Sequence, residues 1–231
     1  ERLLFLIKYG ISYVKQEKEV DGKIESTDQK HIMRYQQMFA AHAVKRQINE
    51  GIKSGVIWHT QGSGKTALSY YLTHVLGDYY AQRKKVAKFY FVVDRLDLLE
   101  QAKQEFEARG LEVKTANTRE ELMAQFRTNQ AQEGNSGNAE ITVVNIQRFA
   151  QDHTAVRLKQ YATNLQRVFI IDEAHRGYDP KGCFLANLFD ADPDSIKIAL
   201  TGTPLLKNER SSWKVFGNYL HTYYYDKTIQ D

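Results

Sequence analysis

Cysteine is scarce in this sequence, and long apolar runs are missing. Cys183 is the only cysteine in 231 residues, which excludes a disulfide within the chain and fits a reducing compartment, so we expect a cytoplasmic protein. No apolar run reaches the roughly 18 residues that a membrane span needs. The start, ERLLFLIKYG, is neither Met-initiated nor shaped like a signal peptide. We therefore expect a fragment, with a further segment before residue 1.

The remaining composition is that of an ordinary globular protein. Hydrophobic residues make up 42% and charged residues 26% of the chain, and its length allows a full core to be buried. The net charge of +4 and the isoelectric point near 8.9 mildly favour polyanionic partners without requiring nucleic acid.

Apolar segments alternate with segments of helical periodicity. We expect strands at residues 55–60, 88–94, 111–116, 141–146, 167–173 and 196–203. We expect helices at 33–49, 64–76 with a stop at Gly77, 96–109 with a stop at Gly110, 118–130, in the region leading to 165, and at 181–189. The stretch AQEGNSGNAE (131–140) is expected to be a flexible surface loop.

This alternation predicts an α/β fold with a mostly parallel sheet. Strands that are apolar throughout, each followed by a helix, imply helices on both faces of the sheet and right-handed crossovers. Ligands of such sheets bind beyond the carboxyl ends of the strands. The segments that follow the strands are therefore the candidate sites.

The stretch WHTQGSGKTALSYYL (58–72) runs from the end of a strand through a loop into a helix. Gly62 and Gly64 allow backbone N–H groups to converge on an anion at a helix N-terminus. Lys65 can then reach the β- and γ-phosphates of a nucleoside triphosphate, and the Thr66 hydroxyl can bind Mg²⁺. The general P-loop pattern has a glycine where this chain has His59, and a glycine-rich turn that closes a hairpin or caps a helix is the alternative. The predicted ATP-binding residues of this loop are Thr60, Gln61, Gly62, Ser63, Gly64, Lys65 and Thr66.

The stretch IIDEAHR (170–176) places two carboxylates at the end of a buried strand. A buried carboxylate is unfavourable unless it meets a cation. Mg²⁺ held by Thr66 and the phosphates would supply that cation, which makes Asp172 the metal partner. Glu173 is then placed to orient or deprotonate the attacking water. An ion-paired or helix-capping Asp-Glu pair is the alternative.

The stretch LTGTP (200–204) ends another strand with hydroxyls and a glycine. Alone it fits an ordinary turn equally well. The order of a P-loop, DEAH and TGTP, however, resembles motifs I, II and III of superfamily 2 helicases and translocases.

Further strings narrow the resemblance. WHTQGSGKT, FVVDRLDLLEQ (91–101), ITVVNIQRF (141–149), IIDEAHR and LTGTP together resemble the motor subunit of type I restriction-modification enzymes, and RYQQ (34–37) resembles the segment before its P-loop. The general P-loop pattern has a glycine at the position of His59, and this family resembles the present sequence in departing from that pattern there. The resemblance implies a RecA-like lobe at 32–204, preceded by a connector at 1–31 from a nuclease domain and followed by an exit segment at 205–231 toward a second lobe.

The resemblance also implies an activity. It is ATP-driven translocation of double-stranded DNA, within a complex that includes methylation and specificity subunits and cleaves DNA through a nuclease outside this chain. Lys65 would stabilise the γ-phosphate, Thr66 and Asp172 would hold Mg²⁺, and Glu173 would activate water. The nucleotide state would be relayed toward DNA by His175, Thr201 and Thr203.

Two more groups follow from the resemblance. Gln37 matches the glutamine that reads adenine, with Gln36 as the alternative by one residue, and both could equally be plain surface positions. The loops after VVD and VVNI would contact DNA phosphates through Arg95, Asn145 and Gln147. The family commonly has paired threonines where this chain has Val144 and Asn145, and Arg95 could instead be a salt-bridge partner. For the aromatic cluster of Tyr219, Tyr223, Tyr224 and Tyr225 we favour packing over base stacking.

Two other functions compete with this interpretation. One is another superfamily 2 ATPase, such as an RNA helicase or a repair motor, against which WHTQGSGK and VVDR argue. The other is a nucleotide-dependent docking module, because phosphoryl transfer needs an arginine finger that two-lobed motors supply from the other lobe. We therefore expect the isolated fragment to bind MgATP weakly and to hydrolyse it poorly. No NKxD string of a GTPase and no kinase-type lid follow the P-loop.

Overall fold

Seven strands form one sheet in the computed structural model, which describes residues 1–20, 23–127, 140–146, 164–174, 189, 192–203 and 216–224. The strand order is β5-β6-β4-β7-β8-β3-β9, and every neighbouring pair is parallel. The strands are β3 (Ser54–His59), β4 (Val86–Val93), β5 (Glu112–Ala116), β6 (Glu140–Asn145), β7 (Leu165–Ile171), β8 (Ile196–Thr201) and β9 (Tyr219–Tyr223). The predicted parallel sheet is confirmed.

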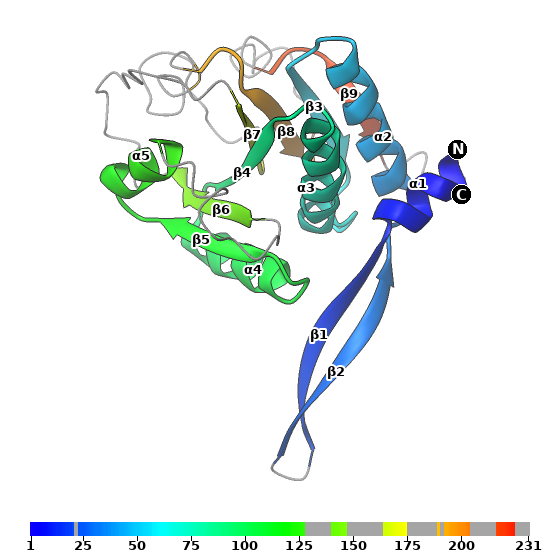
Figure 1. Cartoon of the computed structure of the whole chain (residues 1–231). Coiled ribbons are helices and arrows are strands. Elements are labelled where there is room, and N and C mark those ends of the chain that lie inside the picture. The colour runs from blue at the N-terminus through cyan, green and yellow to red at the C-terminus, as the bar shows by residue number, and fades with distance from the viewer. Residues whose placement is uncertain are drawn as a thin grey trace.

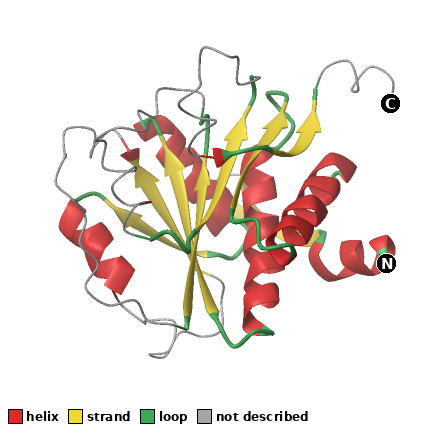
Figure 2. Ribbon diagram, turned by 90° about the horizontal axis from the view of Figure 1, so that it is seen from above, coloured by secondary structure: helices red, strands yellow, loops and turns green. Residues whose placement is uncertain are grey.

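Helices cover both faces of this sheet (Figure 2). One face packs against α2 (Tyr35–Asn49), α3 (Lys65–Ala81) and α4 (Leu96–Glu107), and the other packs against α5 (Arg119–Arg127), Phe189 and Phe216. Alternate residues of β4 enter the two cores, with Phe91 on the first side and Tyr90 on the second. Each is 1% exposed, as expected of a strand buried on both faces.

One predicted helix end is wrong. The helix that follows the P-loop was expected to stop at Gly77, but α3 continues to Ala81. Tyr79 and Tyr80, beyond the glycine, are only 7% and 6% exposed. Burying two aromatic side chains outweighs the penalty of about 1 kcal/mol for a glycine inside a helix. The other predicted stop is confirmed, because Gly110 has a φ of +81° just after α4.

The N-terminal segment contains a helix and a hairpin that the sequence analysis did not predict. Helix α1 (Arg2–Tyr9) leads into β1 (Ile11–Val20), which pairs antiparallel with β2 (Lys23–Ile32). The hairpin projects from the body as an arm (Figure 1). It is attached at its base, where Ser12 is buried and the Lys15 N–H donates to the Ala108 carbonyl at 2.9 Å.

Several predicted features lie outside the described residues. They are the loop at 131–140 apart from Glu140, which begins β6, most of the helical region leading to 165, and the helix at 181–189 apart from Phe189. No helix of the described part is long and apolar enough to cross a membrane.

Candidate functional site

The segment Thr60–Gly64 forms a tight loop between β3 and α3. Gly62 and Gly64 both have a φ of +79°, which lies in the left-handed region that favours glycine. The Ser63 N–H donates to the Thr60 carbonyl at 3.2 Å and closes a turn. Gly64 is the N-cap of α3, so the first N–H groups of that helix lie at the loop. A helix N-terminus beneath a glycine-rich loop is a site for anions such as phosphate.

Lys65 is the first residue of α3 and lies where three strand ends meet. Its side chain is 9% exposed, and its Nζ lies 3.7 Å from Oε1 of Glu173, just after β7. A Cβ added to Gly202, just after β8, would lie 3.4 Å from Lys65 Nζ and 3.7 Å from the backbone nitrogen of Gln61. The P-loop, DEAH and TGTP segments therefore adjoin one another at this edge of the sheet.

The residues that follow β7 are held by both neighbouring strands. The Asp172 N–H donates to the Val92 carbonyl of β4 at 2.8 Å, and the Ala174 N–H donates to the Leu200 carbonyl of β8 at 3.0 Å. Between them, Glu173 has a φ of +48°, a left-handed conformation that is strained for a residue with a side chain. The strained residue is the one predicted to activate water.

The environment of Asp172 suits a bound cation. Burial, together with the nearby Glu173 carboxylate, raises the pKa of Asp172 to about 6, against the effect of the Lys65 ammonium. Asp172 and Thr66 line the same cavity of about 280 Å³, with Gly64, Ala67, Phe91, Leu98, Gln101, Ala102 and Glu105. Carboxylate and hydroxyl oxygens are ligands that Mg²⁺ prefers. The described residues contain no group of three His, Cys, Asp or Glu that could hold a metal, so Mg²⁺ here would depend on phosphate and water oxygens as well.

The end of β8 is ordered by its own hydroxyl. Thr201 Oγ1 donates to the Thr203 carbonyl at 2.9 Å and accepts from the Thr203 N–H at 3.2 Å. This turn fixes Gly202 beside Lys65. Thr201 is fully buried, whereas Thr203 is exposed. His175, the third residue predicted to couple the site to DNA, lies outside the described residues.

The Gln37 side chain forms a hydrogen bond with the P-loop backbone. Its Nε2 donates to the Gly64 carbonyl at 2.9 Å, and its Oε1 accepts from the Arg34 N–H at 2.9 Å. Gln36 and Gln37 are 6% and 4% exposed, so the alternative that either is a plain surface residue is wrong. Because both ends of the Gln37 amide are occupied by protein, reading adenine would require it to exchange one of these bonds. Its role in adenine recognition stays a prediction.

His59 and β9 are part of the site that the sequence analysis missed. His59 is 1% exposed, and its Nε2 lies 2.8 Å from Nδ1 of His221 on β9. Burial, followed by the charges that His221 and Lys65 can carry, lowers the pKa of His59 to about 3. The Thr60 N–H donates to the Tyr223 carbonyl of the same strand at 3.0 Å. The only sequence signal was that His59 replaces a glycine of the general pattern.

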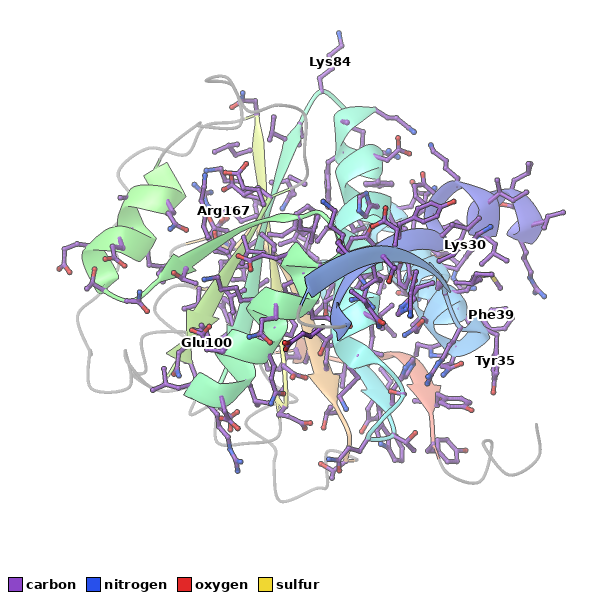
Figure 3. The ribbon with its side chains drawn as sticks, turned by 90° about the horizontal axis from the view of Figure 1, so that it is seen from below. Lys30, Tyr35, Phe39, Lys84, Glu100 and Arg167 are labelled. Atoms are coloured by element: carbon purple, nitrogen blue, oxygen red, sulfur yellow. The ribbon has the colours of Figure 1, made fainter. Side chains whose placement is uncertain are left out.

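The C-terminal tyrosines pack against the lobe. The Trp58 ring stacks on Tyr224 with centroids 5.1 Å apart and contacts Tyr219 at 5.8 Å. Tyr223 meets the ring of Tyr35 edge-on at 5.7 Å. Figure 3 shows Tyr35 and Phe39 on the outer side of α2, away from Lys84. The packing interpretation is confirmed for these three tyrosines, and Tyr225 lies outside the described residues.

The residues predicted to contact DNA differ in exposure. Arg95, the N-cap of α4, is exposed and forms no ion pair with any residue that the structure describes, so the salt-bridge alternative has no support. Asn145, at the end of β6, is only 1% exposed, because it is enclosed beside β4. Gln147 lies outside the described residues. Of the two residues that the structure describes, Arg95 is therefore the accessible one.

A family model described as SWI2/SNF2 ATPase matches residues 36–231. Among curated proteins, the endonuclease subunit of the type I restriction enzyme SauCOLORF180P from Staphylococcus aureus (strain COL) is 34% identical over 210 residues, which are 86% of this chain and 21% of that protein. The HindI endonuclease subunit from Haemophilus influenzae is 31% identical over 188 residues, 77% of this chain and 17% of that protein. The chain thus spans about a fifth of the length of these relatives.

Solved structures show the same fold at lower identity. The DNA-bound Type ISP restriction-modification enzyme LlaBIII superposes with a TM-score of 0.62 at 13% identity, over 92% of this chain and 16% of that one. A nuclease-deletion mutant of the Type ISP enzyme LlaGI, in complex with a DNA substrate mimic, gives 0.55 at 14% identity, over 86% and 20%. The family model begins within α2, so α1 and the hairpin lie outside the matched region.

Proposed function

The chain belongs to the SWI2/SNF2 ATPase family, and from this premise we propose that it is the first RecA-like lobe of a motor that uses ATP to translocate double-stranded DNA. The resemblance to endonuclease subunits of type I restriction enzymes supports a place in such an enzyme. The observation that carries the proposal is the convergence of Lys65, Glu173 and Gly202 at one edge of the sheet.

The phosphates of ATP would bind over the N-terminus of α3. In the structure, Lys65 forms an ion pair with Glu173. An incoming γ-phosphate would replace Glu173 as the partner of the Lys65 ammonium group. Glu173 would then be released to orient the attacking water and accept its proton. The Lys65 ammonium would stay to balance the charge that develops on the transferring phosphoryl group.

Thr66 and Asp172 are the residues that would hold Mg²⁺, because both line one cavity and burial raises the pKa of Asp172. The bound ion would neutralise charge on the phosphate oxygens. A cation would keep Asp172 ionised in this position. The chain's own contribution is the backbone bond from the Asp172 N–H to the Val92 carbonyl, which fixes the main chain of Asp172 at the end of β7.

The remaining assignments belong to the same proposal. Arg95, with Asn145 and Gln147, would contact DNA phosphates without reading sequence. Thr201, Thr203 and His175 would couple the nucleotide state to DNA. Residues 1–31 would connect to a nuclease domain, and residues 205–231 would lead to a second lobe whose arginine completes the site. Methylation and specificity subunits would be the partners, and this lobe alone would turn over ATP poorly.

The test is DNA-stimulated ATP turnover in the full-length protein. Lys65→Ala and Glu173→Gln should each abolish it, and displacement of a DNA triplex should stop with it. A matched control is Glu112→Gln, on β5 and far from the site in the sheet order, which should leave both activities unchanged. Turnover retained in both site variants would overturn the proposal.

A further inference from the structure

Strand β9 is attached to the start of the P-loop by two polar contacts and to α2 by a third. Nδ1 of His221 lies 2.8 Å from Nε2 of His59. The carbonyl of Tyr223 accepts from the Thr60 N–H at 3.0 Å, and the Tyr35 hydroxyl donates to the Tyr223 hydroxyl at 2.8 Å. Figure 1 shows β9 at the end of the sheet beside α2, with β3 on its other side. A strand more than 150 residues along the chain from the P-loop therefore holds it in place.

These contacts determine where the P-loop begins. Thr60 is its first residue, and its N–H is used by β9, while its carbonyl accepts from Ser63 and closes the turn of the loop. Glycines in the rest of the loop give it little stiffness of its own. The position of the Thr60 peptide groups is thus transmitted to Ser63 and to the N-terminus of α3. A shift of β9 would move the groups that face the phosphates.

The contact between His59 and His221 joins two side chains, so substitutions can test it. His59 is 1% exposed, and its bond with His221 is the only hydrogen bond of the His59 ring among the described residues, where Nδ1 has no partner. One nitrogen of the pair must donate and the other must accept, so each ring satisfies a nitrogen of the other. Without His221, a second ring nitrogen would be buried and unsatisfied, so the end of β3 would have to move to reach water.

Resting on the proposed ATPase function, we propose that β9 is a structural part of the triphosphate site and that His221 is a positioning residue, which holds the P-loop through His59. The contact acts on the backbone that binds phosphate, and His221 itself touches no substrate. Whatever displaces the segment that follows β9 would therefore change the affinity of the P-loop for nucleotide, and nucleotide binding would in turn fix β9.

The experiment measures MgATPγS binding by calorimetry in the full-length protein. His221→Ala should weaken binding about tenfold, and His59→Ala should do the same. The double variant should be no weaker than either single one, because both remove the same contact. Thr222→Ala is the matched control, since Thr222 is the next residue of β9 and its side chain forms no hydrogen bond among the described residues. It should bind as the unchanged protein does.

A rescue variant separates positioning from simple packing. In His221→Asn the amide can return a polar group near the place of Nδ1, so this variant should restore most of the affinity. His221→Leu, which restores volume without a hydrogen bond, should not. In turnover assays, His221→Ala should raise the KM for ATP about tenfold with kcat changed less than twofold, as for a loss of uniform binding.

Thermal unfolding of every variant accompanies these measurements. Unchanged MgATPγS affinity of a folded His221→Ala protein, or effects of His59→Ala and His221→Ala that simply add, would overturn the inference. The proposed function fails in a different way. If Lys65→Ala binds MgATPγS as the unchanged protein does, the P-loop assignment is wrong. If Lys65→Ala loses binding while His221→Ala keeps it, only the role of β9 is wrong.

Discussion

Nζ of Lys65 lies 3.7 Å from Oε1 of Glu173, and Glu173 is one of two non-glycine residues with a positive φ among the described part of the chain. The predicted phosphate-binding cation and the predicted base thus neutralise each other in the structure. This relationship and the contacts around it lead to four predictions.

Glu173→Gln should slow hydrolysis while leaving nucleotide bound. The amide keeps the shape of the side chain but cannot accept a proton, so we expect a loss of about 10²–10⁴-fold in single-turnover hydrolysis. Removing the carboxylate partner of Lys65 also frees the ammonium, so MgATPγS affinity should stay equal or rise. Single-turnover measurements and calorimetry check the two parts. A large loss of affinity would contradict this role of Glu173.

The backbone strain at Glu173 should be measurable as stability. At a φ of +48° a Cβ is unfavourable, so Glu173→Gly should be more stable than Glu173→Ala by about 1 kcal/mol. Urea unfolding of both variants gives the difference. At Gln104, an exposed position inside α4, the order should reverse, with the alanine variant more stable by about 1 kcal/mol. If alanine is the more stable residue at both positions, Glu173 is unstrained.

The pKa of Asp172 should make the metal-free protein less stable at neutral pH. Its pKa is raised from 3.8 to about 6, so the folded state holds this proton more tightly than the unfolded state. The contribution of Asp172 to the free energy of unfolding is therefore largest below about pH 4 and is lost as the pH rises through about 6. Asp172→Asn should be more stable than the unchanged protein at pH 7 by roughly 2 kcal/mol, and the two should converge near pH 4.

Urea unfolding in EDTA, without nucleotide, checks this dependence. Asp194 supplies the control, because its pKa is lowered by the hydrogen bond and charge of Lys53. Asp194→Asn should give no gain at pH 7. Equal stability of the Asp172→Asn and unchanged proteins across this pH range would refute the raised pKa.

Gly64 and Gly62 should respond differently to alanine, although both have a φ of +79°. A Cβ at Gly64 would lie 2.5 Å from Nε2 of Gln37, whereas a Cβ at Gly62 would have nothing within 4 Å. Both substitutions carry the left-handed penalty of about 1 kcal/mol, so Gly64→Ala should be the less stable variant. Adding Gln37→Ala to the Gly64→Ala variant should recover the stability that Gly64→Ala loses beyond the loss in Gly62→Ala. Equal unfolding midpoints for the two alanine variants would show that Gln37 does not constrain the loop.

Much of the sheet and the main site could be predicted because the signals are local. Apolar strands such as the one containing Phe91 are readable from composition, and the residue types of the P-loop and of Asp172 and Glu173 indicate their chemistry. The end of α3 was missed because the glycine signal is local, whereas the burial of Tyr79 and Tyr80 is tertiary.

The hairpin and the histidine pair were missed for related reasons. The strands of the hairpin are held by backbone pairing from Ile11↔Ile32 to Val20↔Lys23, and their charged sequence has no apolar alternation to reveal this. His59 and His221 are 162 residues apart, and nothing in either segment indicates that β9 adds to the sheet beside β3.

The base of the hairpin closes on itself. Ile11 pairs with Ile32, and the Met33 N–H donates to the Gly10 carbonyl at 2.7 Å, so the chain returns to the point from which it departed. The path from α1 to α2 is consequently the same whatever the arm's length. Such a position tolerates insertion well. A fluorophore or a surface tether could therefore be attached to the arm without disturbing the nucleotide site.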